Sequence, residues 1–564
     1  HLPEQPHALR RAAQRDIILE TAIDQVCGTE KWLLLFNMSK EEEVERAHPE
    51  GEVQISGNQE AEAVTSLDTF AGKIHVKWAP EATVSSLGLM PFFIEFLKTS
   101  GLFDKWVEDG PLHYRSGNAP EKRNVLGTLL LSVLAGHWRY AHISAIRGDG
   151  INPELLGMTA VASEDSVRRG LKAMDEAESG EWLKRHLKAS YEPLLPEPWV
   201  LDVDTTVKPL YGHQQDAVAG YNPHKPGRPS HAYHCYFVAN IRVVLDVEVQ
   251  AGNQTAPSFA QPQLWAFLDG LAERSRPVFL RGDCHWGAEK AMLGAEERQL
   301  GFLFKLKQSA NVKKLIEQIF RKEEWVEAGQ EWQGREDELR LSGWSKARRV
   351  VVLRRPIRNK RAVEAQPVDK KKSKRKAAKQ LTLDLPELTH QGVPYEYVVL
   401  VTSLTGQVRS VAQHYRDRGD VENNFDELKN QWGWAGFTTQ DRKRCQIMGR
   451  IIALVYNWWT IFMRLGIPDK HAEAITSRPL ALHGIARQTR HGNQTTVEIT
   501  STHAKASQIA AILTKVSAFL KRIKTIAEQL TQGDRWKLIL SAAFRNFLGG
   551  KVIGKTGRLD DAIG

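Results

Sequence analysis

Four side chains that could act on a phosphate group are spaced along the segment from Tyr415 to Lys429. If the segment forms one helix, a rotation of about 100° per residue places Tyr415, Arg418, Glu422 and Lys429 within one stripe of the helix surface. A carboxylate can hold a divalent cation, and neighbouring cations and a phenol can hold phosphate oxygens. The same pattern also suits a solvated helix face with ion pairs, so this segment alone does not decide between a site and a surface.

The spacing Tyr-x2-Arg-x3-Glu-x6-Lys resembles the Y-R-E-K signature of cut-and-paste insertion-sequence transposases of the DDE type. In that family the glutamate is the third catalytic carboxylate, and two aspartates precede it on strands of a ribonuclease-H-like sheet. The resemblance therefore implies that Glu422 is catalytic and that Tyr415, Arg418 and Lys429 bind DNA. It extends over roughly residues 75–465.

Two aspartates upstream stand at the ends of predicted strands. Asp204 ends the run Trp-Val-Leu-Asp-Val-Asp and is followed by two threonines, which resembles the first motif of the family. Asp283 ends the run Val-Phe-Leu-Arg-Gly-Asp. Asp202 lies on the same strand face as Asp204, because side chains repeat every two residues, and it is an alternative for the first position. A strand-end cap or a turn residue is the other interpretation of each aspartate, but three carboxylates in the expected order favour catalysis.

Carboxylates in this number suit hard divalent cations. The resemblance implies two Mg²⁺ ions, replaceable by Mn²⁺, held by Asp204, Asp283 and Glu422. Two such ions can activate an attacking oxygen and stabilise a leaving oxygen in phosphoryl transfer. The implied partner is double-stranded DNA, both as transposon ends and as target. Because two ends must be held together, the family also implies a homodimer.

The segment between the second and third motifs is rich in tryptophan and in basic residues. Trp325, Trp332 and Trp344 are candidates for stacking on a flipped base, because excision in the resembled family often passes through a hairpin whose flipped base is held by an aromatic residue of an inserted domain. Packing in a core is the alternative for each. We expect the following basic run to contact phosphates, and it includes Lys371, Lys372, Lys374 and Arg375.

Histidines and cysteines gather near the first two motifs, but their spacing matches no zinc-site pattern. They are His213, His224, His231, His234, Cys235, Cys284 and His285. The sequence therefore does not predict zinc ligation. His285 and Trp286 also depart from the polar or small residues expected after Asp283 in the family, which leaves the details of the second motif open.

The composition is that of a globular protein with a polyanionic partner. The 564 residues suffice for two to four domains, and the net charge of +10 favours nucleic acid. Four scattered cysteines without a Cys-x2-Cys pair fit a reducing cytoplasm. The longest apolar runs are too short to span a bilayer, so we expect no membrane association and no small-molecule substrate. The resemblance implies a bacterial cell and a location at the nucleoid.

The hydrophobic periodicity predicts an α/β protein with a ribonuclease-H-like catalytic core, a helical domain before it and a helical region after it. The sequence begins at His1, and we expect translation to start at Met38, which would make residues 1–37 a non-native extension. A loose arm (1–71) is expected first, followed by a mainly helical domain that binds DNA ends or mediates dimerisation (72–195). The core is expected in two parts, the first at 196–310 and the second, with the last core strand and the glutamate-bearing helices, at 394–465. A β-rich basic insertion (311–393) separates these two parts, and a helical C-terminal domain (466–564) follows.

These features predict a DNA transposase that binds terminal inverted repeats and catalyses Mg-dependent strand cleavage and strand transfer. It would move a bacterial insertion sequence by cut and paste, with or without a hairpin end. One alternative is a catalytically silent, transposase-derived DNA-binding protein, which would not need three intact carboxylates. Another is a stand-alone metal-dependent nuclease on the same fold. The pair Arg418 and Lys429 and the large insertion favour the transposase.

Overall fold

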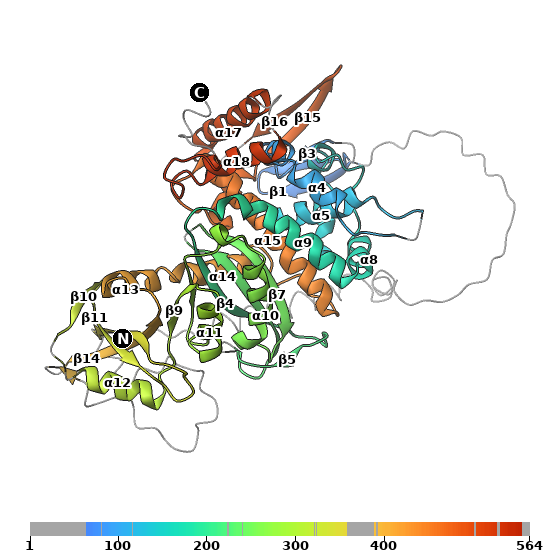
Figure 1. Cartoon of the computed structure of the whole chain (residues 1–564). Coiled ribbons are helices and arrows are strands. Elements are labelled where there is room, and N and C mark those ends of the chain that lie inside the picture. The colour runs from blue at the N-terminus through green and yellow to red at the C-terminus, as the bar shows by residue number, and fades with distance from the viewer. Residues whose placement is uncertain are drawn as a thin grey trace, which may run out of the picture. The chain divides into compact units, whose positions relative to one another are not determined.

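The computed structural model describes most of the chain from residue 64 onward (Figure 1). The described residues are 64–79, 82–114, 117–222, 225–239, 241–320, 322, 324–357, 389–390, 393–500, 504–526 and 531–554. The predicted phosphate-contacting residues Lys371, Lys372, Lys374 and Arg375 and the proposed extension 1–37 lie outside them. The chain divides into two compact units, His1–Pro80 and Glu81–Gly564. In the first, β1 (Thr65–Thr69) and β2 (Gly72–Val76) form an antiparallel hairpin.

A large mixed sheet lies at the centre of the second unit. Its core strands are β4 (Val200–Pro209), β6 (Pro229–Val238), β7 (Val243–Ala251), β8 (Phe279–Gly282) and β9 (Gly301–Lys305), with the short β5 (Val218–Ala219) beside β6. β6 is antiparallel to both β4 and β7, whereas β8 runs parallel to β4 and β9 parallel to β8. The order β7-β6-β4-β8-β9 is the ribonuclease-H-like arrangement, so the predicted fold class is confirmed.

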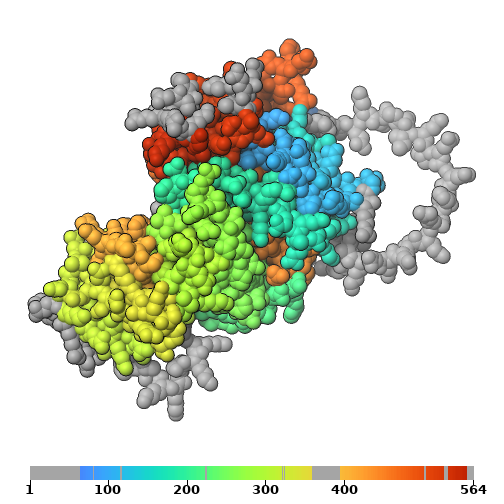
Figure 2. Space-filling view, in the orientation of Figure 1, coloured from blue at the N-terminus to red at the C-terminus, as the bar shows by residue number. Residues whose placement is uncertain are grey.

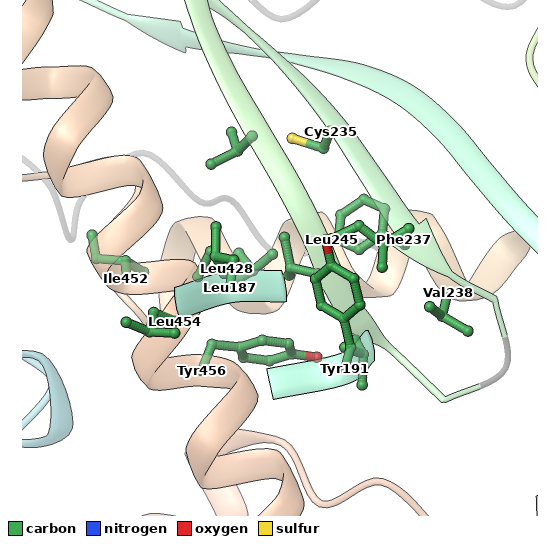
Figure 3. Close-up of a cluster of buried hydrophobic side chains, with 14 of the residues drawn as sticks. Leu187, Tyr191, Cys235, Phe237, Val238, Leu245, Leu428, Ile452, Leu454 and Tyr456 are labelled. Carbon is green, nitrogen blue, oxygen red and sulfur yellow. The ribbon is translucent and has the colours of Figure 1, made fainter. Parts of the chain in front are cut away.

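Helices connect the parallel strands and cover the sheet. α10 (Pro257–Asp269) lies between β7 and β8 in sequence, and α11 (Glu289–Glu297) between β8 and β9, as parallel strands require crossover connections. α15 (Arg442–Gly466) is buried along most of its length and packs on β7 and on α9 (Glu176–Tyr191). A helix that is apolar on nearly all sides belongs inside a protein. Figure 3 shows this core, where Leu187, Phe237, Leu428 and Ile452 come from separate elements.

The predicted β-rich insertion extends the same sheet. Its elements are α12 (Ala310–Phe320), β10 (Val326–Gly329), β11 (Trp332–Leu339), β12 (Arg348–Pro356) and β13 (Thr389–His390), followed by β14 (Val393–Thr402) and α13 (Val408–Arg416). β14 pairs antiparallel with both β12 and β9, and this pairing joins the insertion to the core sheet. α13 packs on β10, and in Figure 2 its orange surface adjoins the yellow surface of the insertion.

Helices from both ends of the second unit pack together. The N-terminal ones are α3 (Met90–Ser100), α4 (Leu102–Glu108), α5 (Lys122–Leu134), η1 (Tyr140–His142), α6 (Ile143–Ile146), α7 (Asn152–Leu155), α8 (Glu164–Ala173) and η2 (Glu192–Leu194). A further short helix, η3 (Glu273–Ser275), belongs to the core and precedes β8. The C-terminal ones are α16 (Ala474–Ala481), α17 (Ala506–Ile526) and α18 (Gln532–Ala543). Both α17 and α18 contact α3.

The C-terminal region also holds a feature that its helical pattern did not predict. β15 (Ile485–His491) and β16 (Gln494–Thr500) form an antiparallel hairpin, and β15 pairs with β3 (Val84–Ser85). None of the helices in the described ranges is long and apolar enough to cross a membrane.

Candidate active site

Two adjacent parallel strands place Asp204 and Asp283 side by side. In the register of β4 and β8, Val203 is the partner of Gly282, and the next residue on each chain is an aspartate. Both aspartates line a pocket with a volume of 290 Å³, which Lys429 also lines. The strand pairing therefore brings the two carboxylates together, Asp204 on β4 and Asp283 directly after the end of β8.

The two carboxylates differ in their hydrogen bonds and in their ionisation. Burial raises the pKa of Asp204 to about 6, a rise that the charge of Arg418 opposes and that of Asp283 increases. Burial also acts to raise the pKa of Asp283, but the hydrogen bonds and charge of His285 outweigh it and hold the pKa below its usual value. The His285 backbone N–H donates to Asp283 Oδ1 at 2.9 Å, and the ring Nδ1 lies 2.7 Å from Oδ2. At neutral pH the pocket thus holds two negative charges in close proximity.

Asp202, the alternative first aspartate, serves another purpose. Its side chain is buried and accepts two hydrogen bonds from Arg281, from Nε at 2.5 Å and from Nη2 at 2.7 Å. Arg281 also donates to the backbone carbonyl of His414. Both oxygens of Asp202 are thus occupied, and Asp202 does not line the pocket. Its geometry supports Asp204 as the first aspartate.

The prediction of one continuous helix from Tyr415 to Lys429 was wrong. α13 ends at Arg416, and α14 (Gly419–Asn430) begins three residues later. Around the break the Arg418 N–H donates to the Tyr415 carbonyl at 3.2 Å, and the Val421 N–H donates to the Arg418 carbonyl at 2.9 Å, which are tight-turn contacts. Gly419 lowers the cost of leaving the helix at this point.

The break directs Arg418 toward the carboxylates. Its guanidinium pairs with Asp204, and its Nη1 lies 3.7 Å from Glu422 Oε1. The Arg418 side chain is 11% exposed, whereas that of Glu422 is 75% exposed and does not line the pocket. Burial acts to lower the pKa of Arg418, but Asp204 and other anionic neighbours raise it, so the residue stays charged. Glu422 is therefore connected to the two aspartates through Arg418.

The other two predicted phosphate-binding residues occupy different positions. Lys429 lies in the pocket wall, where burial lowers its pKa. Tyr415 packs against the hydrophobic cluster around Phe279 and Leu400, and burial raises its pKa, so its phenol stays protonated and can donate a hydrogen bond. The structure brings Lys429, but not Tyr415, into the pocket.

The three predicted base-stacking tryptophans lie outside the pocket, each with an arginine over its ring. The guanidinium carbons of Arg354, Arg355 and Arg348 lie 4.0, 4.9 and 5.4 Å from the ring centroids of Trp325, Trp332 and Trp344. Arg348 also binds Glu289 and Glu296 of α11, which connects the insertion to the core. In this arrangement one face of each tryptophan is already covered.

An aromatic residue that was not among the predicted site residues lies in the pocket wall. Tyr221 is 58% exposed, and its ring centroid is 5.7 Å from that of His285 in an edge-on contact. Cys284 and Trp286 also line the pocket, and a Cβ at Gly282 would lie 2.8 Å from the Trp286 ring. The only sequence signal for these residues was their proximity to the two aspartate motifs.

Comparison with known proteins agrees with this geometry. Residues 195–458 match the family described as transposase DDE domain. No curated protein matches the chain. Among solved structures, the chain resembles piggyBac transposase in a synaptic complex with hairpin DNA, at a TM-score of 0.35 and 10% identity, over 84% of this chain and 87% of that chain. By the family match and the pair of aspartates on adjacent strands, residues 195–458 are a transposase DDE domain.

Proposed function

We propose that the chain binds the terminal inverted repeats of a bacterial insertion sequence and moves the element by cut and paste. The main observation in support is that Asp204, Asp283 and Lys429 line one pocket and that Arg418 pairs with Asp204. The reaction would use double-stranded DNA ends and target DNA, with two copies of the chain holding paired ends at the bacterial nucleoid.

The residues of the pocket fit a hard divalent cation. Asp204 and Asp283 supply carboxylate oxygens, which Mg²⁺ prefers, and burial together with the charge of Asp283 raises the pKa of Asp204 in spite of Arg418. Asp204 and Asp283 would hold the metal, and Glu422 would join them when Arg418 releases it. We propose two Mg²⁺ ions, replaceable by Mn²⁺. Bound there, they would supply Lewis-acid activation of the attacking oxygen and stabilisation of the leaving oxygen.

The cations of the site suit the scissile phosphate. Lys429 projects into the pocket and would hold a non-bridging phosphate oxygen, where it stabilises the charge that develops during transfer. Arg418 would exchange its contact with Asp204 for a contact with the phosphate, because an arginine fork binds carboxylate and phosphate equally well. Tyr415 would donate a hydrogen bond to a neighbouring phosphate oxygen.

A basic and aromatic segment next to the pocket suits the flanking DNA. Lys225 and Arg228 both lie over the ring of Tyr211, at 4.9 and 4.7 Å from its centroid. We propose that this segment and the basic run containing Lys371 contact phosphates. If excision passes through a hairpin, the position of Tyr221 in the pocket wall favours it as the base-stacking residue.

The test is cleavage of a labelled duplex carrying the terminal repeat found beside the gene, in the presence of Mg²⁺. Wild type is compared with Glu422→Gln and with the matched control Asp426→Asn, an exposed acid on the same helix. End-specific cleavage that is lost only in Glu422→Gln, with DNA binding retained, is expected. Cleavage without end preference would indicate a stand-alone nuclease. Binding without cleavage by wild type would indicate a DNA-binding descendant of a transposase.

A further inference from the structure

Three consecutive residues at the end of β8 bring three different metal-ligand chemistries together. One ligand atom each from Asp283, Cys284 and His285 lies within 4.8 Å of the others. They form the only such group of histidine, cysteine and acidic side chains among the residues that the structure describes. All three are partly exposed, and all three line the 290 Å³ pocket.

The donor set differs from the one that a magnesium site requires. Mg²⁺ takes oxygen ligands, whereas a thiolate and an imidazole select borderline-soft cations, above all Zn²⁺. Neither the Cys284 sulfur nor the His285 ring nitrogen has a role in the phosphoryl transfer proposed above. A carboxylate, an imidazole and a thiolate together form a three-ligand zinc set that leaves the fourth position open.

The local geometry lets the three ligands converge without unfolding the strand end. Asp283 Oδ2 and His285 Nδ1 are already 2.7 Å apart, so a cation would replace the hydrogen bond between them. The His285 ring is held against Tyr221, and the backbone after Asp283 turns so that the Trp286 N–H donates to the Asp283 carbonyl at 3.1 Å. In an extended strand, the side chains of adjacent residues point to opposite faces. The turn instead brings the side chains of these three adjacent residues together.

We propose that Asp283, Cys284 and His285 form an inhibitory zinc site within the catalytic pocket. Zinc binding would displace the Cys284 thiol proton to solvent and would withdraw Asp283 from the hard metal ions that cleavage requires. Divalent zinc binds nitrogen and sulfur donors more tightly than Mn²⁺ does, so low zinc concentrations would compete with a large excess of Mg²⁺ or Mn²⁺. The inhibitory effect rests on the proposed function, whereas zinc binding itself does not.

The binding experiment uses the full-length chain without DNA, with Zn²⁺ and Co²⁺ as probes. Wild type should bind one Zn²⁺ in the presence of excess Mg²⁺, and its Co²⁺ form should show a thiolate-to-cobalt charge-transfer band. In Cys284→Ser the band should disappear and zinc binding should weaken by at least about tenfold, since loss of an outer-shell partner alone costs that much. His285→Gln should also weaken binding but retain the thiolate band. His213→Gln, which changes an exposed histidine outside the pocket, is the control.

Cleavage then tests inhibition separately, with each variant compared with its own rate in the absence of zinc. We expect Zn²⁺ to lower Mg²⁺-dependent cleavage in wild type and in His213→Gln, with inhibition at least about tenfold less sensitive to zinc in Cys284→Ser, in line with the weaker binding. Equal zinc affinity of wild type and Cys284→Ser, or a charge-transfer band that persists in Cys284→Ser, would overturn the site. Zinc binding as expected in a protein that cleaves no DNA would leave the site standing and refute the proposed function.

Discussion

Arg418 pairs with Asp204 across 214 residues of sequence and simultaneously lies 3.7 Å from Glu422. One guanidinium therefore connects a carboxylate in the catalytic pocket with a carboxylate outside it. Because the positive charge of Arg418 lowers the pKa of Asp204 against the effect of burial, the arginine helps to determine the pH at which the pocket becomes fully ionised.

This pairing predicts a shift in the pH dependence of cleavage. Wild-type activity should rise as Asp204 ionises around pH 6 and level off above that pH, because a protonated carboxyl is a poor metal ligand. In Arg418→Gln the pKa of Asp204 should increase, so the midpoint of the rate profile should move to higher pH. Arg418→Lys should shift the midpoint less. A midpoint that is the same in all three proteins would contradict the role of the pair.

Asp204→Asn should make the stability of the protein less dependent on pH. The folded-state pKa of about 6 lies above the ordinary aspartate value of 3.8, so ionised Asp204 opposes folding, and stability is lost as the pH rises between these values. Asn carries no charge at this position, so the loss of stability between pH 4 and pH 8 should be smaller in the variant than in wild type. Urea unfolding of both proteins at pH 4 and pH 8 measures it. Glu248→Gln should act in the same direction, because burial raises the pKa of Glu248 to about 7 outside the catalytic pocket, whereas Asp426→Asn, which changes an exposed acid, is the control.

Asp202→Asn should lower the stability of the protein at neutral pH. Its loss leaves Arg281 buried without a counter-charge, and breaking a buried ion pair costs about 3–5 kcal/mol. The same unfolding measurement at pH 7 gives the value. If Asp202→Asn were as stable as wild type but inactive, Asp202 and not Asp204 would be the first metal-binding aspartate.

Tyr221→Ala should weaken a step that requires an unstacked base. Stacking of one base on an aromatic ring is worth about 1–3 kcal/mol, which corresponds to roughly 5–150-fold in the formation of the cleaved end. Tyr221→Trp should retain most of the activity, and Trp332→Ala is the matched control outside the pocket. Fluorescence of 2-aminopurine placed at the terminal nucleotides reports unstacking directly. Equal signals from wild type and Tyr221→Ala would exclude the assignment.

Replacing Lys371, Lys372, Lys374 and Arg375 by serine should reduce DNA affinity without changing end specificity. The plot of log K against log salt has a negative slope, and each phosphate contact that is lost makes this slope less steep by about 0.9. Binding titrations at several salt concentrations measure the slope for the repeat and for unrelated DNA. A loss restricted to the repeat would instead mean that the run contacts bases.

The sequence predicted the core because its signals are local to each strand. The alternating and apolar runs identified β4 and β8, and the parallel register then placed Asp204 beside Asp283. The helix break at Arg418 was not predictable in this way: Gly419 alone costs a helix only about 1 kcal/mol, and the attraction that turns Arg418 out of the helix comes from an aspartate far away in sequence.

The sequence did not predict that the side chains of Cys284 and His285 converge, and the reason is related. Zinc patterns are recognised by spacings that bring residues from separate turns together, whereas here one turn after β8 brings adjacent residues together. The contacts of arginines with Trp325, Trp332 and Trp344 could not be predicted from the sequence either, because the cross-strand neighbours of a side chain depend on strand register.

The distance in sequence between Asp204 and its cation has a consequence during synthesis. A chain still on the ribosome that ends before Arg418 contains both aspartates but lacks their counter-charge, the Lys429 side chain and the helix α15 that covers β7. Two uncompensated carboxylates disfavour the closed sheet at that stage, so the nuclease centre is completed only in the last quarter of translation. An incomplete chain therefore lacks both cations of the pocket, and we expect it not to cleave DNA.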